Sequence, residues 1–512
     1  MSKTLPYRSQ LFAAVFLLST SYISASQALD DESSSPTWDV AAPHYSVDAQ
    51  TLPLNVSEGT WMNLDVSPDG RHIAFDMLGD IYQLPISGGK AEPLLSGHAW
   101  EIQPQYSPDG RFLAFTSDRN GADNIWVMDL SNPGNKQQIT HETFRLLNNP
   151  SWHPSGNYLV AKKHFTTSRS LGTGEVWLYD ANIDAGIARE NLSGSVLVER
   201  PSAAFQKELG EPTFSADGQS VFYIQNTTPG NTFIYHEDSN GEVMAIKRYD
   251  LQSGETSKVV GGAGGAVRPT PSPDGKSLAF VKRVRAASRL FVMDLESGEQ
   301  TMLVDDLDPD MQETWAVQGA YPTMAWMPDS QEIVYWSKGK IWRVDVATKR
   351  SVNIPFEVND ERTAYPAVQV AVEVAPDTLK TSMPRFAVQS PSSNTVVFES
   401  MGKLYSRYPD GKTKRLTRDN GNSRELSPAF SPDGKTVFYL SWTDSGLGSV
   451  RKVRATGGRS AAVYSTPGHY VDLSVSSDGK TLLFTKLSGS SLTSPYWGKK
   501  PGIYTYTLGD KT

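Results

Sequence analysis

Short apolar segments alternate with polar ones along most of the chain, and many of them begin directly after a tight polar turn. The turn Ser67–Gly70, with the sequence Ser-Pro-Asp-Gly, is followed by the alternating segment His72–Phe75. Proline presets φ in such a turn, aspartate hydrogen-bonds the neighbouring backbone, and glycine accepts a positive φ. The same turn recurs, each time before an apolar segment, at Ser107–Gly110, Ser272–Gly275 and Ser431–Gly434. The pattern predicts a β-strand after each turn.

A second apolar segment follows each of these predicted strands and in most copies ends at an acidic residue. Period-2 alternation in both segments predicts antiparallel hairpins that extend into small sheets. The second segments are Ile81–Leu84, Ile125–Asp129, Val176–Asp180, Leu290–Asp294, Ile341–Asp345 and Ile503–Tyr506.

The turn motif occurs in nine copies, of which five are weaker: His153–Gly156, Ser215–Gly218, Ser476–Gly479, Met327–Ser330 and Ser390–Ser393. The shortest steps between copies are about 40–46 residues, close to the period of a four-stranded propeller blade. Longer steps indicate loops inserted at roughly 162–210, 226–243, 302–322 and 356–385, where propellers carry function. Because Pro-Asp-Gly would break helical repeats, we predict an all-β fold, a β-propeller of four-stranded antiparallel blades over residues 60–512.

The number of copies leaves the arrangement of the blades open. Propeller rings usually hold about 4–8 blades, so nine copies fit one wide ring, two rings or an incomplete set. The segment Gln50–Val56 could be a lone outer strand that completes the last blade, closes the ring and covers an exposed sheet edge. An array of β-sandwiches is the rival fold, but its turns would not repeat one motif so closely.

The N-terminus predicts a secretory signal peptide over residues 1–28. Lys3 and Arg8 precede the short apolar core Leu11–Ser19, and small residues at Ser26 and Ala28 predict cleavage after Ala28. The apolar run is about half the length that a membrane-spanning helix needs. We therefore expect a periplasmic or secreted protein with no membrane span after cleavage, in which residues 29–59 form a segment ahead of the propeller.

Composition narrows the chemistry that the chain can perform. It has no cysteine, which excludes disulfides, thiolate metal sites and cysteine nucleophiles. The net charge is −8 with both signs interspersed, so we expect no nucleic-acid partner. The 12 tryptophans, 21 tyrosines and 19 phenylalanines suit many short, half-buried strands.

Motifs for catalysis are missing from the sequence. The eight histidines form no His-x-His or His-Glu-x-x-His pair, and no Gly-x-Ser-x-Gly nucleophile elbow is present. We predict no catalytic, cofactor-binding or metal-binding residue and no cofactor. Lys163, His164 and Arg169, in the first inserted loop, are candidates for contacting an anionic ligand; a solvated charged loop is the alternative, which we favour.

The repeats resemble the WD40-like repeats of TolB, of the Tricorn protease propellers and of the propellers of prolyl-oligopeptidase-type peptidases. Longer stretches are similar to exported bacterial proteins in which a TolB-like propeller precedes an amidohydrolase domain. These stretches are Glu58–Met62, Phe144–Pro150, Lys163–Thr167, Ser170–Glu175, Met311–Ala316 and Leu492–Pro495. The resemblance implies a C-terminal hydrolytic domain with a histidine-held metal centre, and we expect that domain to be absent from these 512 residues.

These observations predict a non-catalytic exported propeller module of an amidohydrolase-like protein. Such a module would bind or gate substrate or support the hydrolytic domain, with a peptide or protein partner and a separate hydrolase domain or subunit. The alternative is a stand-alone periplasmic TolB-like scaffold that binds proteins. TolB carries a small α/β domain ahead of its propeller, and residues 29–60 are too short for one, which weakens the alternative.

Overall fold

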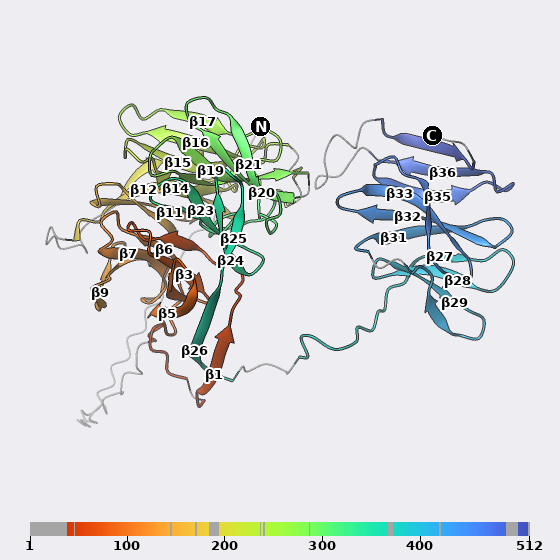
Figure 1. Cartoon of the computed structure of the whole chain (residues 1–512), viewed down its shortest axis with the longest axis horizontal. Coiled ribbons are helices and arrows are strands. Elements are labelled where there is room, and N and C mark those ends of the chain that lie inside the picture. The colour runs from red at the N-terminus through yellow and green to blue at the C-terminus, as the bar shows by residue number, and fades with distance from the viewer. Residues whose placement is uncertain are drawn as a thin grey trace, which may run out of the picture. The chain divides into compact units, whose positions relative to one another are not determined.

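The computed structural model describes residues 38–509, apart from 46, 144–145, 169–170, 184–193, 236, 239–240, 286, 367–371, 419–420 and 488–499. In this part of the chain the secondary structure consists of strands without α-helices, arranged in nine sheets (Figure 1). It accordingly contains no helix that could cross a membrane. The all-β prediction is confirmed, whereas the predicted signal peptide lies outside the described residues.

Six sheets form a closed ring of blades, and each blade uses four consecutive strands. The first three blades are β2 (Leu64–Val66), β3 (His72–Met77), β4 (Asp80–Pro85) and β5 (Gly89–Leu95); β6 (Glu101–Tyr106), β7 (Phe112–Ser117), β8 (Asn124–Asp129) and β9 (Asn132–Gln138); and β10 (Leu147–Trp152), β11 (Tyr158–Thr166), β12 (Gly172–Asp180) and β13 (Ser195–Val198). The next three are β14 (Leu209–Phe214), β15 (Ser220–Asn226), β16 (Met244–Asp250) and β17 (Thr256–Val260); β18 (Val267–Pro271), β19 (Ser277–Val284), β20 (Ala287–Asp294) and β21 (Gln300–Val304); and β22 (Ala325–Trp326), β23 (Glu332–Ser337), β24 (Lys340–Asp345) and β25 (Ser351–Ile354).

The first strand of each blade is innermost, and the ring closes through these strands. Each innermost strand contacts that of the next blade, and β2 contacts β22. At this closure Thr323 exchanges hydrogen bonds with Leu64: the Leu64 N–H donates to Thr323 Oγ1 at 2.8 Å, and Thr323 Oγ1 donates to the Leu64 carbonyl at 2.9 Å. Blades one and six are thus joined by residues far apart in the sequence.

The two apolar segments predicted in each repeat are the second and third strands of a blade. In the first blade they are β3 and β4, which pair antiparallel with Ile73 opposite Leu84. Side chains of these strands fill the spaces between blades, and Ile73, Phe75 and Phe280 are fully buried. Burying a side chain of this size stabilises the fold by about 1.5–3 kcal/mol. The sequence pattern therefore located the core of each blade.

The repeated turn has one geometry wherever the full motif is present. In the first copy the Gly70 N–H donates to the Ser67 carbonyl at 2.8 Å, and Gly70 has a φ of 71°. The Ser67 hydroxyl donates to Asp69 at 2.6 Å and accepts from the His72 N–H at 2.9 Å. The bonds that Asp69 accepts from the Ser67 hydroxyl and from the Arg71 N–H hold the pKa of its carboxyl below its usual value. Serine and aspartate thus tie the turn to the strand that follows.

The segment Gln50–Val56 is a strand, β1, but it does not complete the last blade as expected. It pairs antiparallel with β26 (Phe356–Ala364), and β26 pairs parallel with β5 at the outer edge of the first blade. The sixth blade already has four strands of its own, and the chain leaving it covers the edge of β5. The edge available to β1 is therefore that of β26.

The remaining three sheets form a second set, residues 385–507. They are β27 (Arg385–Gln389), β28 (Val396–Ser400), β29 (Lys403–Arg407) and β30 (Thr413–Arg415); β31 (Arg424–Phe430), β32 (Thr436–Thr443), β33 (Leu447–Arg454) and β34 (Ala461–Tyr464); and β35 (Tyr470–Val475), β36 (Thr481–Lys486) and β37 (Gly502–Thr507). Their first strands contact one another in the order β27, β31, β35. Nine repeats thus divide into one six-bladed ring and a set of three blades.

Candidate functional site

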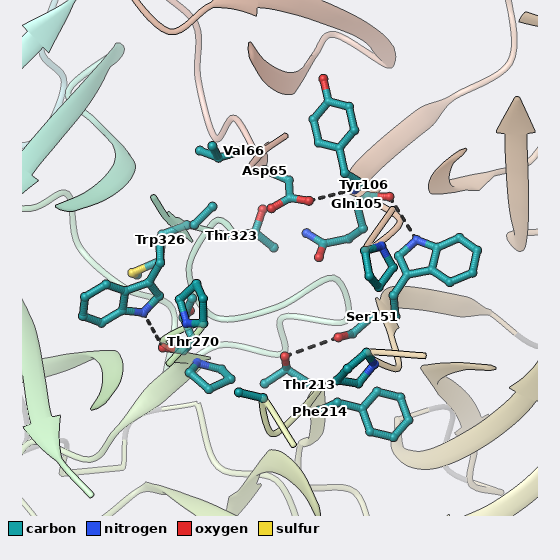
Figure 2. Close-up of a pocket in the computed structure, with 18 of the residues that line it drawn as sticks. Asp65, Val66, Gln105, Tyr106, Ser151, Thr213, Phe214, Thr270, Thr323 and Trp326 are labelled. Atoms are coloured by element: carbon teal, nitrogen blue, oxygen red, sulfur yellow. Dashed lines mark hydrogen bonds between the residues drawn. The ribbon is translucent and has the colours of Figure 1, made fainter. Parts of the chain in front are cut away.

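A cavity of about 440 Å³ lies at the centre of the ring, on the face where the repeated turns gather. All six blades contribute to its wall (Figure 2). Polar side chains of the wall include Asp65, Gln105, Ser151, Thr213, Thr270 and Thr323, together with serines of the repeated turns. The turn prolines line the mouth: Pro68, Pro108, Pro154, Pro273 and Pro328. The cavity is therefore a product of the whole ring and not of one inserted loop.

Hydrogen bonds at the cavity wall join neighbouring blades. Asp65 accepts from the Tyr106 N–H at 2.7 Å, which joins blades one and two. The Trp326 indole donates to the Thr270 carbonyl at 2.9 Å, and the Trp152 indole donates to the Gln105 carbonyl at 3.2 Å. Figure 2 draws these bonds together with the contact between the hydroxyls of Ser151 and Thr213. The wall is held in place by the same contacts that hold the ring closed.

The floor of the cavity is a buried polar cluster that we call the inner polar ring: Gln103, Asn149, Glu211 and Arg268. Each of these residues precedes a proline, has a φ between 50° and 59°, and stands at a bulge of its innermost strand. All four are at most 5% exposed. Positive φ is costly for residues other than glycine. The bulge therefore stores backbone strain while it places a polar side chain inside the channel.

The members of the inner polar ring bind one another. The Asn149 N–H donates to Gln103 Oε1 at 2.7 Å, and the Arg268 guanidinium donates to Asn149 Oδ1 at 3.1 Å. Arg268 and Glu211 form an ion pair at 3.3 Å, and the Arg268 N–H donates to the same carboxylate at 2.5 Å. Burial of these groups is tolerated because each finds a partner.

Residues 305–322, in the loop between β21 and β22, close the channel on the side away from the turns. Its backbone carbonyls accept hydrogen bonds from the inner polar ring: Gln103 Nε2 donates to Gln318 O at 2.8 Å, and Arg268 Nε donates to Tyr321 O at 2.7 Å. The Ala320 N–H donates to Glu211 at 2.6 Å. We call this segment the plug loop. Because it binds side chains of several blades, the cavity ends blindly above it.

Buried ion pairs anchor the plug loop at two further points. The ammonium of Lys162 pairs with Glu208 and donates to the Val317 carbonyl at 2.7 Å. Arg283 binds Asp310 at 2.6 Å in the first half of the loop. Burial raises the pKa of Glu208, and the Lys162 ammonium opposes that rise. The plug loop is thus bonded along its length instead of lying loosely over the opening.

The cavity carries one uncompensated charge among its lining residues. Glu211 and Arg268 neutralise each other, which leaves Asp65 as the remaining charged group of the lining. Asp65 is half-buried, and the surrounding wall desolvates it and raises the pKa of its carboxyl to about 7, an effect that the Tyr106 N–H opposes. Neutral hydroxyl and amide groups make up the rest of the polar wall. The arrangement can therefore bind a hydrogen-bond donor or a cation.

The structure places the predicted ligand candidates outside this cavity. Lys163 lies on β11, forms an ion pair with Glu142 and covers the Trp177 ring at 4.4 Å from its centroid. His164 is buried, and its ring centroid lies 5.4 Å from that of Trp315 in the plug loop. Arg169 lies outside the described residues. Lys163 therefore packs against Trp177 of its own blade and against the connection that precedes this blade, and His164 contacts the plug loop.

Sequence reasoning overlooked the residues that form the floor, although a signal was present. In four ring repeats a proline stands three positions before the first residue of the turn. The residue directly before that proline is the member of the inner polar ring. Proline within a strand marks a bulge or an edge, so a recurrent X-Pro at constant spacing indicates a repeated bulge. The plug loop itself had no comparable signal, because its partners come from blades distant in sequence.

The described residues contain no group of three or more histidine or acidic side chains placed to hold a metal ion. The functional feature that the geometry offers is the blind cavity with its polar wall.

Comparisons with known proteins agree with the fold. Residues 54–208 match the family model of the TolB β-propeller domain (PD40), so the chain contains a TolB-type propeller domain. Dipeptidyl aminopeptidase BIII of Pseudoxanthomonas mexicana is 24% identical over 255 residues, 44% of this chain and 36% of that protein. Tol-Pal system protein TolB of Francisella tularensis is 23% identical over 260 residues, 49% of this chain and 51% of that protein.

Among solved structures, TolB from Acinetobacter baumannii is similar, with a TM-score of 0.42 and 17% identity over 59% of this chain and 64% of that chain. The chain spans about a third to a half of the length of the two curated relatives above. Its repeats are homologous to those of TolB and to propeller regions of peptidases.

Proposed function

We propose that this protein is an exported, non-catalytic propeller module that binds a peptide segment of a partner in its central cavity. The observation that carries the proposal is the blind cavity, which is open at the turn face and closed beneath by the plug loop. A channel that ends blindly holds a ligand but does not let it pass. Binding is therefore favoured over gating through the channel.

The proposal includes the wider setting expected from the sequence. The segment 1–28 would direct export and be cleaved after Ala28, which gives a periplasmic or secreted protein. A separate hydrolytic domain or subunit of the amidohydrolase kind would act on what the module binds or would be supported by it. The likeness to a dipeptidyl aminopeptidase supports a peptide ligand.

A second candidate function is a TolB-like scaffold that binds a partner protein. The likeness to a Tol-Pal system protein supports it. The two functions differ in the partner's form, because a scaffold would bind a folded protein and the module a short peptide segment.

Filling the cavity tests the proposal. Thr213→Trp places a large ring in the cavity wall, and we expect it to lower affinity for peptides at least tenfold, measured by calorimetry with the mature chain. The control is Thr256→Trp on the exposed outer strand β17, which should bind as the parent does. Equal binding by both variants would contradict the proposal, as would hydrolysis of the peptides by the purified chain. If the protein is instead a scaffold, it should bind a folded partner protein and should not bind short peptides.

Export is tested separately, by identifying the N-terminal residue of the recovered protein. We expect the protein recovered from the periplasm or medium to begin at Leu29 by mass spectrometry, and recovery of an intact N-terminus from the cytoplasm would contradict this part of the proposal.

A further inference from the structure

The central cavity combines three properties that restrict what can occupy it. It opens at the turn face and ends at the plug loop, its remaining lining charge is one carboxylate, and the rest of its polar wall is neutral. Figure 2 shows the Asp65 carboxyl directed into the space enclosed by Gln105, Thr213 and Thr323. Each property narrows the chemistry of the ligand in a different way.

The blind end restricts the shape of the ligand. A volume of about 440 Å³ holds a few residues at most. Because the plug loop is bonded to Gln103, Arg268 and Glu211 across the channel, an extended chain cannot thread through. A ligand must therefore enter with its own end first, which can be a chain terminus or the tip of a long side chain.

The charge restricts which end enters. A carboxylate in a partly desolvated wall attracts a cation more strongly than it would in water and repels an anion. A peptide C-terminus, an acidic side chain or a phosphate would meet Asp65 with no uncompensated cation in the lining to offset it. A protonated amine would gain a charge-assisted hydrogen bond from the same group.

The neutral wall fits this cation. An ammonium donates three hydrogen bonds and accepts none. The hydroxyls of Thr213 and Thr323 and the amide oxygen of Gln105 can accept, and all three line the cavity with Asp65. The wall therefore offers several acceptors around one negative charge.

From this geometry we infer that the cavity recognises a primary ammonium group of a peptide, held by Asp65 and inserted from the turn face. The inference rests on the proposed function and specifies the ligand for the same cavity. The ammonium can come from two sources, a free peptide N-terminus or a lysine side chain, and the two share the chemistry described above.

Three matched probes separate these sources: tetra-alanine amide with a free N-terminus, the same peptide acetylated at its N-terminus, and acetyl-Lys-Ala-Ala-Ala-amide. Calorimetry with the mature chain at pH 7.5 should give at least tenfold tighter binding of one or both amine-bearing probes than of the acetylated peptide. Preference for the free N-terminus identifies a terminus as the ligand, and preference for the lysine probe identifies a side chain.

Asp65→Asn should abolish this preference, because asparagine keeps the shape and the bond to the Tyr106 N–H but removes the charge. Asp129→Asn, on a half-buried aspartate at the end of β8 and outside the cavity lining, is the matched control and should keep it. Equal affinity for all three probes, or an unchanged preference in Asp65→Asn, would overturn the inference while leaving peptide binding in place. Failure of every probe to bind the parent chain would overturn both the inference and the proposed peptide-binding function.

Discussion

The six-bladed ring and the C-terminal set of three blades share one repeat unit but make different use of its innermost strand. In four of the six ring blades and in all three blades of the C-terminal set this strand carries a bulge with a residue at positive φ. These residues are Gln103, Asn149, Glu211 and Arg268 in the ring, and Phe386, Ser427 and Asp472 in the C-terminal set. The ring residues are buried, whereas Phe386 is 45% exposed and Asp472 is also exposed.

The difference shows that the local sequence determines where the bulge forms but does not determine what the side chain at the bulge contacts. Where six innermost strands converge, the bulge residues meet one another and the plug loop, and a buried polar network results. In the C-terminal set the same backbone geometry leaves the side chains open to solvent or partly so. A functional cavity therefore needs closure of the ring as well as the repeat.

Breaking the inner polar ring should have the largest effect. Arg268→Met removes the partner of Glu211 and the donor to the plug-loop carbonyl of Tyr321. Leaving a buried carboxylate without its cation costs about 3–5 kcal/mol. We expect that loss in urea denaturation followed by tryptophan fluorescence. Ser427→Ala, at the corresponding bulge of the C-terminal set, should cost only about 0.5 kcal/mol. A second substitution, Glu211→Gln, should restore part of the stability of Arg268→Met; equal costs at the two bulges would refute the comparison.

The second-largest difference between the ring and the C-terminal set should be the pH dependence of the free energy of unfolding. Burial raises the pKa of Asp65 to about 7 and that of Asp76 to about 6, from an ordinary 3.8. Both carboxyls hold a proton more tightly in the folded ring than in the unfolded chain. Their contribution is therefore most favourable below about pH 4 and declines as pH rises to about 7. Hydrogen bonds from the backbone N–H groups of Tyr106 and Val66 oppose the rise in the pKa of Asp65.

Asp65→Asn should remove the contribution of Asp65 to the loss of stability with rising pH. We expect the variant to be more stable than the parent by about 1–3 kcal/mol at pH 8 and close to it at pH 4, by urea denaturation. Asp472→Asn, on the exposed bulge of the C-terminal set, should follow the parent at both pH values. A parallel pH profile for the parent and Asp65→Asn would contradict the desolvation of Asp65.

Replacing the glycine of the repeated turn by alanine should have the smallest effect, and the effect should be the same in the ring and in the C-terminal set. Gly70 in the ring and Gly479 in the C-terminal set both have a φ of 71°, and in each the position of an added Cβ lies 3.3–3.4 Å from a neighbouring turn proline. Substitution by alanine costs about 1 kcal/mol at such a position. Hydrogen exchange of the strands that follow, β3 and β36, should report similar losses. A much larger loss at Gly70 would mean that the turn depends on ring closure.

The repeat, the strand pairs and the turn chemistry could be predicted because they depend on neighbours in the sequence. Ser67, Asp69 and Gly70 bond within a few residues, and Ile73 pairs with Leu84 across one short hairpin. The innermost strands were missed because they are short and contain proline, which weakens the alternation. Lys163 and His164 were proposed as ligand candidates because they form a charged group in the sequence. Their packing partners Glu142, Trp177 and Trp315 could not be identified from sequence spacing alone.

The sequence by itself determined an all-β chain of nine repeated blades, because each blade is specified by contacts within about 45 residues. Only the tertiary structure decided that six blades close into a ring, that β1 joins β26, and that the plug loop seals one end of the channel. Those features depend on pairs such as Leu64 with Thr323 and Gln103 with Gln318, which are separated by 259 and 215 residues. No local pattern encodes such pairs, since they form only when the first and sixth blades meet and six inner strands surround one axis.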